Sequence, residues 1–161
     1  MNKAVFLDRD GVINKELDDY AIHLEDFEIL PDVAPALAEL KKRGYLLIVI
    51  TNQGGIGKDL YTTVDVELLH ASLLDFLDEY GVKIDEIYYC VHHPLTGNCI
   101  CRKPDSLLVE KAIARFNIDV KASYFIGDKE RDILAGQKVG VKGILIEQNT
   151  SLLDAIKQIP K

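Results

Sequence analysis

Hydrophobic runs alternate with amphipathic segments along most of the chain. The short apolar runs predict five strands, at residues 4–7, 45–50, 84–89, 123–126 and 141–146. The run at 45–50 is continuously apolar, which is typical of a strand covered on both faces. Apolar positions at helical spacing predict helices at residues 33–42, 66–80, 106–116 and 130–138, and a closing helix within 151–161.

The alternation of strands and helices predicts an α/β fold with a Rossmann-like parallel sheet and helices on both faces. Right-handed crossovers would place the carboxyl ends of all strands at one edge, where such sheets bind ligands. The polar, irregular segment 15–32 is expected to be a loop beside that site. Because the sequence contains no repeat, low-complexity tract or linker, we expect a single domain over residues 1–161.

Composition narrows the class of protein. The chain has 161 residues, of which 48% are hydrophobic and 28% charged, ordinary values for a globular protein with a sizeable core. Its apolar runs are shorter than the ~20 residues of a membrane helix, and no signal peptide is recognisable, so we expect a cytoplasmic protein without a membrane partner. The net charge of −7 argues against nucleic acid as a partner. An acidic protein that binds phosphate needs local positive charge or a metal ion.

Two acidic motifs follow predicted strands. Asp8 and Asp10 are two residues apart after the first strand, so both can reach one pocket if the chain stays extended. One carboxylate could attack phosphorus while the other handles the leaving-group proton, with a divalent cation between them. Asp128 follows the fourth strand and could bind the metal, and Asp132 could support it one helical turn later. Taken separately, the motifs also fit a solvated turn and an acidic helix start.

Two further motifs could bind phosphate. Thr51, Asn52 and Gln53 follow the second strand, where a hydroxyl and free backbone N–H groups suit phosphate oxygens. Arg102 and Lys103 supply the positive charge that the composition lacks. An ordinary strand-to-loop cap and a solvated cation pair are the alternative interpretations.

The order of these four motifs resembles that of the haloacid dehalogenase (HAD) superfamily of phosphohydrolases, over about residues 3–146. The resemblance implies that Asp8 is a nucleophile that forms an aspartyl-phosphate and that Asp10 is the general acid and base. It implies phosphate binding by Thr51 and Lys103. It also implies Mg²⁺ held by Asp8, the backbone carbonyl of Asp10, and Asp128, where the ion would neutralise developing charge.

Three cysteines and a histidine cluster between the third strand and Lys103. Cys90, His92, Cys99 and Cys101 form a Cys₃His set, a usual structural Zn²⁺ site that leaves no coordination position open. We expect this zinc to fix the loop that carries Arg102 and Lys103. Three free cysteines are the alternative. His93 is a rival ligand, since local sequence barely separates it from His92 and the preference rests on the family resemblance.

The zinc-loop pattern, followed by Arg-Lys-Pro, resembles one branch of the superfamily. That branch contains D-glycero-D-manno-heptose 1,7-bisphosphate phosphatases and histidinol-phosphate phosphatases, and both share the zinc loop. The segment 20–28, the second motif and Lys129 favour the heptose enzymes, which act on the 7-phosphate. Histidinol phosphate remains the alternative substrate.

Too few residues separate Asp10 from Thr51 to form a large cap domain. We therefore expect an open site in which the substrate is bound by the rim residues Arg102, Lys129, Asn52 and Gln53. The two cations among them, Arg102 and Lys129, would contact the distal phosphate. An acidic single domain of this kind is expected to be a monomer.

Two other classes of protein are less consistent with the motifs. A non-catalytic phosphoacceptor module, such as a response-regulator receiver domain, lacks the Asp-x-Asp motif and the Cys₃His loop. A zinc-only interaction protein would leave Asp8, Asp10, Asp128 and Asp132 unexplained.

Overall fold

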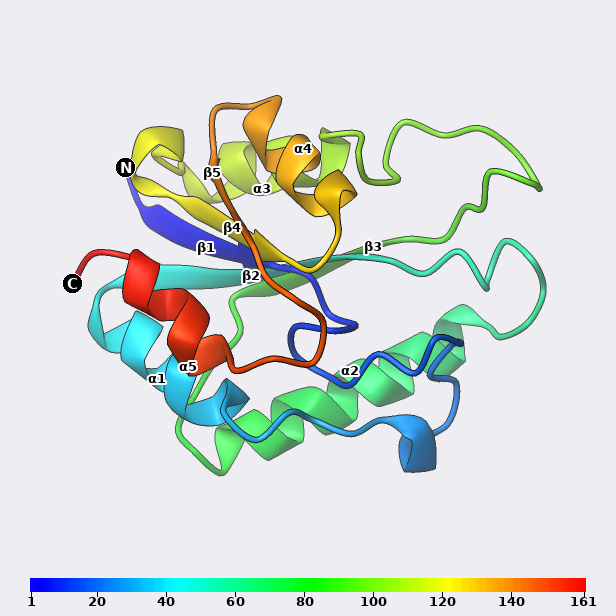
Figure 1. Ribbon diagram of the computed structural model, residues 1–161. Coiled ribbons are helices and arrows are strands. Elements are labelled where there is room, and N and C mark those ends of the chain that lie inside the picture. Colours follow the sequence, from blue (N-terminus) through cyan, green and yellow to red (C-terminus); the bar gives the residue numbers. More distant parts are fainter.

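The computed structural model describes residues 1–161, and its centre is a parallel sheet in the order β3-β2-β1-β4-β5 (Figure 1). The strands are β1 (Lys3–Leu7), β2 (Tyr45–Asn52), β3 (Glu86–Cys90), β4 (Tyr124–Gly127) and β5 (Lys142–Leu145). Every neighbouring pair is parallel, so the carboxyl ends of all strands lie at one edge. The predicted fold class is confirmed.

Helices cover both faces of the sheet. The helices α1 (Val33–Lys42), α2 (Thr63–Asp78) and α5 (Leu152–Ala155) lie on one face, and α3 (Leu107–Phe116) and α4 (Glu130–Gln137) lie on the other (Figure 1). Alternate side chains of β1 divide between two hydrophobic clusters. Val5 and Leu7 join the cluster that contains α1, whereas Ala4 and Phe6 join the one that contains α3. The same division in β2, with Leu47 and Val49 in one cluster and Ile48 and Ile50 in the other, explains why the run at 45–50 is continuously apolar.

Some element boundaries differ from those predicted. Strand β2 continues through Thr51 and Asn52, which pair in register with Tyr89 and Cys90, so the strand ends beyond residue 50. The C-terminal segment forms only α5 and a 3₁₀ turn at Ile156–Gln158, instead of one closing helix.

Helix α2 begins at Thr63, three residues before the predicted start. The Thr62 side chain accepts a hydrogen bond from the backbone N of Asp65, while the Asp65 carboxylate accepts one from the backbone N of Thr62. This capping box supplies two of the hydrogen bonds that a helix start otherwise lacks. Apolar spacing alone does not reveal the helix start, because the capping residues are polar.

Three loops rise from the carboxyl edge of the sheet and surround the ends of the strands (Figure 1). They cover residues 8–32, with a 3₁₀ turn at Leu24–Asp26, residues 53–62, and residues 91–106. None of the three loops carries a large cap domain. The chain also lacks a helix with the length and apolar character that crossing a membrane requires.

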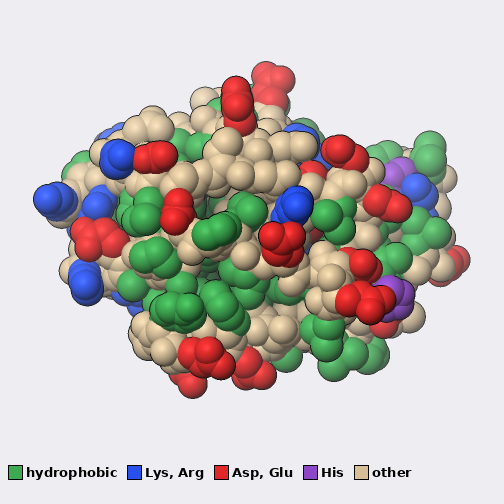
Figure 2. Space-filling view, turned by 60° about the horizontal axis from the view of Figure 1, so that its bottom comes forward, with side chains coloured by type: hydrophobic (Ala, Val, Ile, Leu, Met, Phe, Trp, Pro, Cys, Tyr) green, Lys and Arg blue, Asp and Glu red, His purple; other side chains and the backbone are tan.

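The surface is predominantly acidic, in keeping with the net charge of −7. Figure 2 shows acidic side chains spread across the whole of one face, with hydrophobic side chains scattered between them. Positive charge at the end of the sheet must therefore come from a few specific residues.

Candidate active site

Three aspartates meet at the carboxyl edge of the sheet. Asp8 directly follows β1, Asp128 directly follows β4, and Asp132 lies in the first turn of α4. One carboxylate oxygen from each lies within 4.8 Å of those of the other two. The structure thus brings together three residues that the sequence places in two separate motifs.

Lys103 joins two of these aspartates. Its Nζ lies 2.7 Å from Asp8 Oδ1 and 2.6 Å from Asp132 Oδ1, and it donates to the backbone carbonyl of Ile50 at 2.7 Å. The lysine side chain is 1% exposed and comes from the loop beyond the cysteine cluster. Burial acts to lower its pKa, but the charges of Asp8 and Asp132 outweigh burial and raise the pKa of Lys103. The lysine is therefore held as a buried cation against the candidate nucleophile.

The acidic cluster carries more negative charge than Lys103 neutralises. Burial, together with the charges of Asp132 and Asp10, raises the pKa of Asp8 to about 8, although Lys103 acts to lower it. Burial and the charge of Asp132 also raise the pKa of Asp128, despite the opposing charge of Lys129. A further cation beside these carboxylates would favour their ionised forms.

The cluster fits Mg²⁺. Both carboxylate oxygens of Asp128 are buried and have no hydrogen-bond partner, an unfavourable state for a charged group that the ion pair with Lys129 Nζ, 3.5 Å from Oδ2, offsets only in part. Carboxylate and carbonyl oxygens are the ligands that this ion prefers. Asp8, Asp128 and the backbone carbonyl of Asp10 would hold it, as the family resemblance implies.

Gly11 leaves room for this site. Its backbone has φ +85°, a conformation that glycine adopts without strain. A Cβ atom at this position would lie 2.5 Å from Asp128 Oδ2. A glycine directly after the Asp-x-Asp motif therefore lets the chain turn and pass close to Asp128.

Three side chains hold Asp10. Its Oδ1 accepts hydrogen bonds from Arg9 Nη2 at 2.9 Å and from Asn14 Nδ2 at 2.9 Å, and its Oδ2 accepts one from Gln53 Nε2 at 3.1 Å. Burial acts to raise the pKa of Asp10, but the charge of Arg9 and these hydrogen bonds outweigh it and lower the pKa below its usual value. The carboxylate is thus fixed in orientation.

The last residues of β2 and the residue that follows it also shape the site. Thr51 is fully buried, and its Oγ1 accepts a hydrogen bond from Gln53 Nε2 at 3.0 Å. Asn52 exchanges two hydrogen bonds with the backbone of Lys103, donating from Nδ2 at 3.1 Å and accepting at Oδ1 at 3.0 Å. Asn52 therefore fixes the segment that carries Lys103, a role that sequence reasoning did not assign to it.

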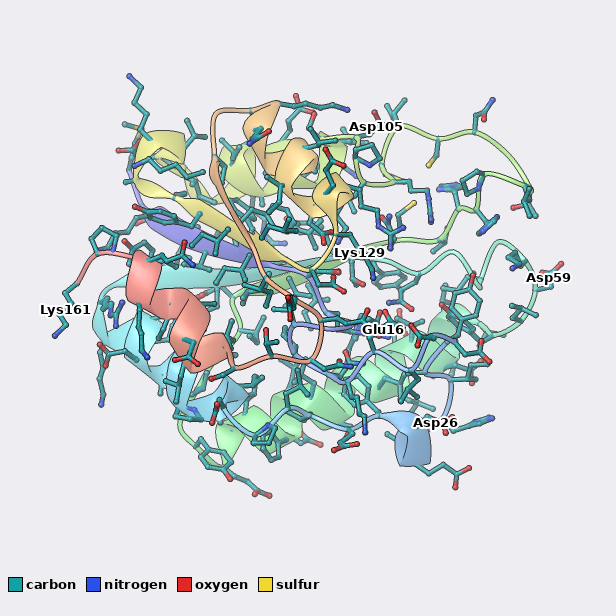
Figure 3. All side chains as sticks on the ribbon, in the orientation of Figure 1. Glu16, Asp26, Asp59, Asp105, Lys129 and Lys161 are labelled. Atoms are coloured by element: carbon teal, nitrogen blue, oxygen red, sulfur yellow. The ribbon has the colours of Figure 1, made fainter.

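A cleft of about 390 Å³ opens above these residues. Its lining includes Asp8, Asp10, Asn52, Gln53, Asp128 and Lys129, together with Arg9, Arg131 and rim residues between Glu16 and Ala21. In Figure 3, the labelled Glu16 and Lys129 lie near each other at the ends of the strands. Lys129 Nζ donates to Gln148 Oε1 at 3.1 Å. Acidic residues dominate the rim.

Arg102 lies outside this cleft. Its Nη1 donates to the backbone carbonyl of His92 at 3.2 Å, and its side chain lines a separate groove along the cysteine loop. The structure therefore brings Lys129, but not Arg102, to the cleft. The contact of Arg102 with substrate remains a prediction.

Sequence reasoning missed several residues that shape the site. On an extended chain the residue between Asp8 and Asp10 points away from their pocket, so the motif gives no sign of a role for Arg9. The chain turns after Leu7, however, and Arg9 folds back onto Asp10. Arg131, one position before Asp132, cannot be singled out from the sequence, because an exposed arginine in the first turn of a helix is common.

The cysteine cluster forms a compact group of four ligand atoms. Cys90 Sγ lies 3.1 Å from Cys101 Sγ, 3.7 Å from Cys99 Sγ and 3.5 Å from His92 Nδ1. All four ligand atoms lie within 4.8 Å of one another. Three sulfurs and one imidazole nitrogen at such separations fit a tetrahedral Zn²⁺. His93 lies outside the group, and its Nδ1 accepts a hydrogen bond from the backbone N of Leu95 at 3.1 Å.

The loop around this cluster packs against residues 53–62. A Cβ atom at Gly57 would lie 2.9 Å from the backbone N of His93 and 2.9 Å from the carbonyl of Val91. The absence of a side chain at Gly57 therefore permits the two loops to touch. This contact ties the cysteine loop to the end of β2.

Comparisons with known proteins agree with this geometry. The HAD-hydrolase-like family matches residues 100–160. The chain is 41% identical over 145 residues to the D-glycero-alpha-D-manno-heptose-1,7-bisphosphate 7-phosphatase of Photorhabdus laumondii, covering 86% of this chain and 79% of that protein. It is 44% identical over 150 residues to the D-glycero-beta-D-manno-heptose-1,7-bisphosphate 7-phosphatase of Helicobacter pylori, covering 92% and 85%.

A solved structure is similar over nearly the whole chain. The D,D-heptose 1,7-bisphosphate phosphatase of B. bronchiseptica, crystallised with magnesium and phosphate, superposes with a TM-score of 0.86. It is 29% identical and covers 99% of this chain and 89% of that protein.

The parallel sheet, the aspartates at its carboxyl edge and these similarities define a HAD-like phosphatase, a phosphoric monoester hydrolase. Within that class, the chain belongs to the family of D-glycero-D-manno-heptose-1,7-bisphosphate 7-phosphatases.

Proposed function

We propose that this enzyme removes the 7-phosphate of D-glycero-D-manno-heptose 1,7-bisphosphate through an aspartyl-phosphate on Asp8. The observation that carries the proposal is the placement of Asp8 beside both the buried Lys103 cation and the buried carboxylate of Asp128, which accepts no hydrogen bond. The names of the relatives support the choice of substrate.

The reaction then has two steps. Because its lowered pKa keeps Asp10 ionised in the free enzyme, Asp10 must take up a proton once substrate binds. In the first step, a carboxylate oxygen of Asp8 then bonds to phosphorus, the bond to the sugar oxygen breaks, and Asp10 gives that oxygen the proton. In the second, Asp10 takes a proton from water as the water oxygen attacks phosphorus. Phosphate leaves, and both aspartates return to their starting forms.

The phosphoryl group requires positive charge on several sides. Lys103 Nζ and the Thr51 hydroxyl would contact its oxygens, while Asp132 holds Lys103 in place. Mg²⁺ bound by Asp8, the Asp10 carbonyl and Asp128 would neutralise charge and orient the phosphoryl group.

Substrate selection would come from the rim, because the cleft has no cap domain over it. Lys129 lines the cleft and would contact the distal phosphate, and Asn52 and Gln53 also line the cleft. Arg102 would have to swing from its hydrogen bond with the His92 carbonyl to take part.

The Cys₃His cluster would bind a structural Zn²⁺ that fixes the loop between β3 and Lys103. Support comes from the ligand distances and from the position of His92 inside the cluster. We further propose that residues 1–161 form one domain that acts as a cytoplasmic monomer.

The test compares kcat/KM, with Mg²⁺ present, for both anomers of heptose 1,7-bisphosphate and for histidinol phosphate, with Asp8→Asn as the blank. A strong preference for the bisphosphate supports the proposal, and a preference for histidinol phosphate overturns the substrate assignment but leaves the chemistry intact.

The distal-phosphate contact is tested separately, with Lys129→Ala as the variant and Arg102→Ala as the comparison. The proposed contact requires Lys129→Ala to reduce kcat/KM more for the bisphosphate than for a heptose 7-phosphate. Equal losses for the two substrates would exclude it.

A further inference from the structure

A buried chain of polar contacts leads from helix α2 to Asp10. The Arg9 side chain is 1% exposed. Its Nη2 donates to Asp10 Oδ1 at 2.9 Å, and its Nη1 lies 3.2 Å from Nε2 of His70. His70 is 6% exposed and comes from the middle of α2, far in sequence from the catalytic motifs.

The chemistry of Arg9 determines the protonation of His70. A guanidinium remains charged and can only donate hydrogen bonds, so Nε2 of His70 must be the acceptor. The imidazole is therefore neutral, with its proton on Nδ1. In agreement, burial and the charge of Arg9 lower the pKa of His70 to about 3, although the charge of Asp10 opposes them.

The remaining contacts of the Arg9 side chain do little to orient it. Its Nε is buried without a hydrogen-bond partner, and the guanidinium carbon lies 5.4 Å from the centre of the Phe27 ring. An aromatic face attracts a cation but does not fix the rotation of the guanidinium plane. The hydrogen bonds to His70 and Asp10 are thus the two contacts that set that rotation.

We propose that His70 is a positioning residue: by accepting a hydrogen bond from Arg9, it aims the guanidinium that holds the Asp10 carboxylate in line with the leaving-group oxygen. His70 itself touches neither substrate nor metal. The proposal rests on the proposed role of Asp10 as general acid and extends it to a residue on a different element.

Substitutions at His70 can separate the hydrogen bond from simple packing. His70→Gln places an amide oxygen where Nε2 now accepts, so it keeps the contact with Arg9. His70→Leu fills the space without an acceptor. His70→Asn is polar but too short to reach Arg9, and it replaces the leucine variant if that variant does not fold.

The measurement is kcat/KM for two substrates that differ in their leaving group. An alkyl phosphate, such as a sugar phosphate, needs a proton on its leaving oxygen, whereas 4-nitrophenyl phosphate does not. Since kcat/KM reports the steps up to leaving-group departure, a misaimed Asp10 affects the alkyl substrate selectively. For His70→Leu and His70→Asn we expect a loss of roughly ten-fold with the alkyl phosphate and less than about two-fold with the aryl phosphate.

His70→Gln is expected to restore the alkyl activity to within about three-fold of the unaltered enzyme. Equal losses of kcat/KM for the two substrates would overturn the positioning role. It would also be overturned if neither His70→Leu nor His70→Asn lost activity. Failure of the proposed function is distinguishable, because it would show as absent alkyl phosphatase activity in the unaltered enzyme.

Discussion

At the scale of single residues, the site depends on buried charges that neutralise one another. Lys103 is enclosed by Asp8, Asp132 and the Ile50 carbonyl. A buried pair of this kind is costly to break, because the remaining charge has no partner and no water. An acidic protein can thus present a cation to a phosphoryl group without a basic surface.

Replacement of Lys103 by methionine is expected to affect both stability and catalysis. Lys103→Met leaves Asp8 and Asp132 side by side without their cation, so we predict a loss of roughly 3 kcal/mol in the free energy of unfolding. Phosphatase activity should fall to the level of the blank. Urea denaturation and phosphate release measure the two effects.

Arg102→Met is the matched control for this experiment. The side chain is next in sequence but makes one hydrogen bond, to a backbone carbonyl. We expect it to change the free energy of unfolding by less than about 1 kcal/mol. If the two variants were equally stable, Lys103 would not be the buried partner described here.

His70 should make stability depend on pH. Its pKa is lowered from 6.5 to about 3 on folding, so the unfolded chain takes up a proton below pH 6.5 that the folded chain refuses. Stability from this group is therefore present above pH 6.5 and is lost as the pH falls. Between pH 6.5 and pH 5 the loss should be about 2 kcal/mol.

His70→Gln carries no titratable group and should lose less stability over the same pH range. Other ionisations are common to both proteins and cancel in the difference between their unfolding free energies. Parallel pH profiles for the two proteins would contradict a neutral, buried His70.

At the scale of elements, the strand ends and the loops that follow them position the chemistry. Asp8 follows β1, Thr51 and Asn52 end β2, Cys90 ends β3 and Asp128 follows β4. The parallel register brings these ends to one edge of the sheet. Four of the five strands therefore each deliver one part of the site.

The loop between β3 and Lys103 offers a paired test of zinc binding. His92→Ala removes a ligand atom from the cysteine cluster, whereas His93→Ala removes an imidazole whose Nδ1 faces the Leu95 backbone. We expect the His93 variant to bind about one zinc ion per chain and the His92 variant to lose it. Metal analysis of the purified proteins measures both.

Loss of zinc should also lower activity, because Lys103 follows the cluster directly. Adding a chelator to the unaltered enzyme and restoring Mg²⁺ alone should leave activity reduced. Zinc retained by the His92 variant and lost by the His93 variant would reverse the assignment of the ligand.

The sequence predicts the elements better than the contacts between distant segments. Strand-end motifs are local, so the aspartates and the cysteine cluster are visible in one pass along the chain. The pairing of Arg9 with His70 depends on how α2 packs against the loop after β1, which no local pattern encodes. The start of α2 was mispredicted for a related reason. Its capping box consists of polar residues, which add nothing to the apolar periodicity.

At the scale of the whole molecule, the fold provides a rigid sheet edge and leaves selection to its rim. The clusters on the two faces bury alternate residues of the same strands, so the edge that carries Asp8 is supported from both sides. The loops above it carry no large cap domain, and the cleft stays open. An open cleft suits a small, doubly phosphorylated metabolite.

Asp8 should become phosphorylated during turnover. The most direct measurement is an acid quench during steady-state hydrolysis of heptose 1,7-bisphosphate, followed by mass spectrometry of the peptide that contains residues 8–11. We expect a phosphoryl group on Asp8 in the unaltered enzyme and none in Asp8→Asn, which should also release no phosphate. Continued phosphate release by Asp8→Asn would rule out Asp8 as the nucleophile.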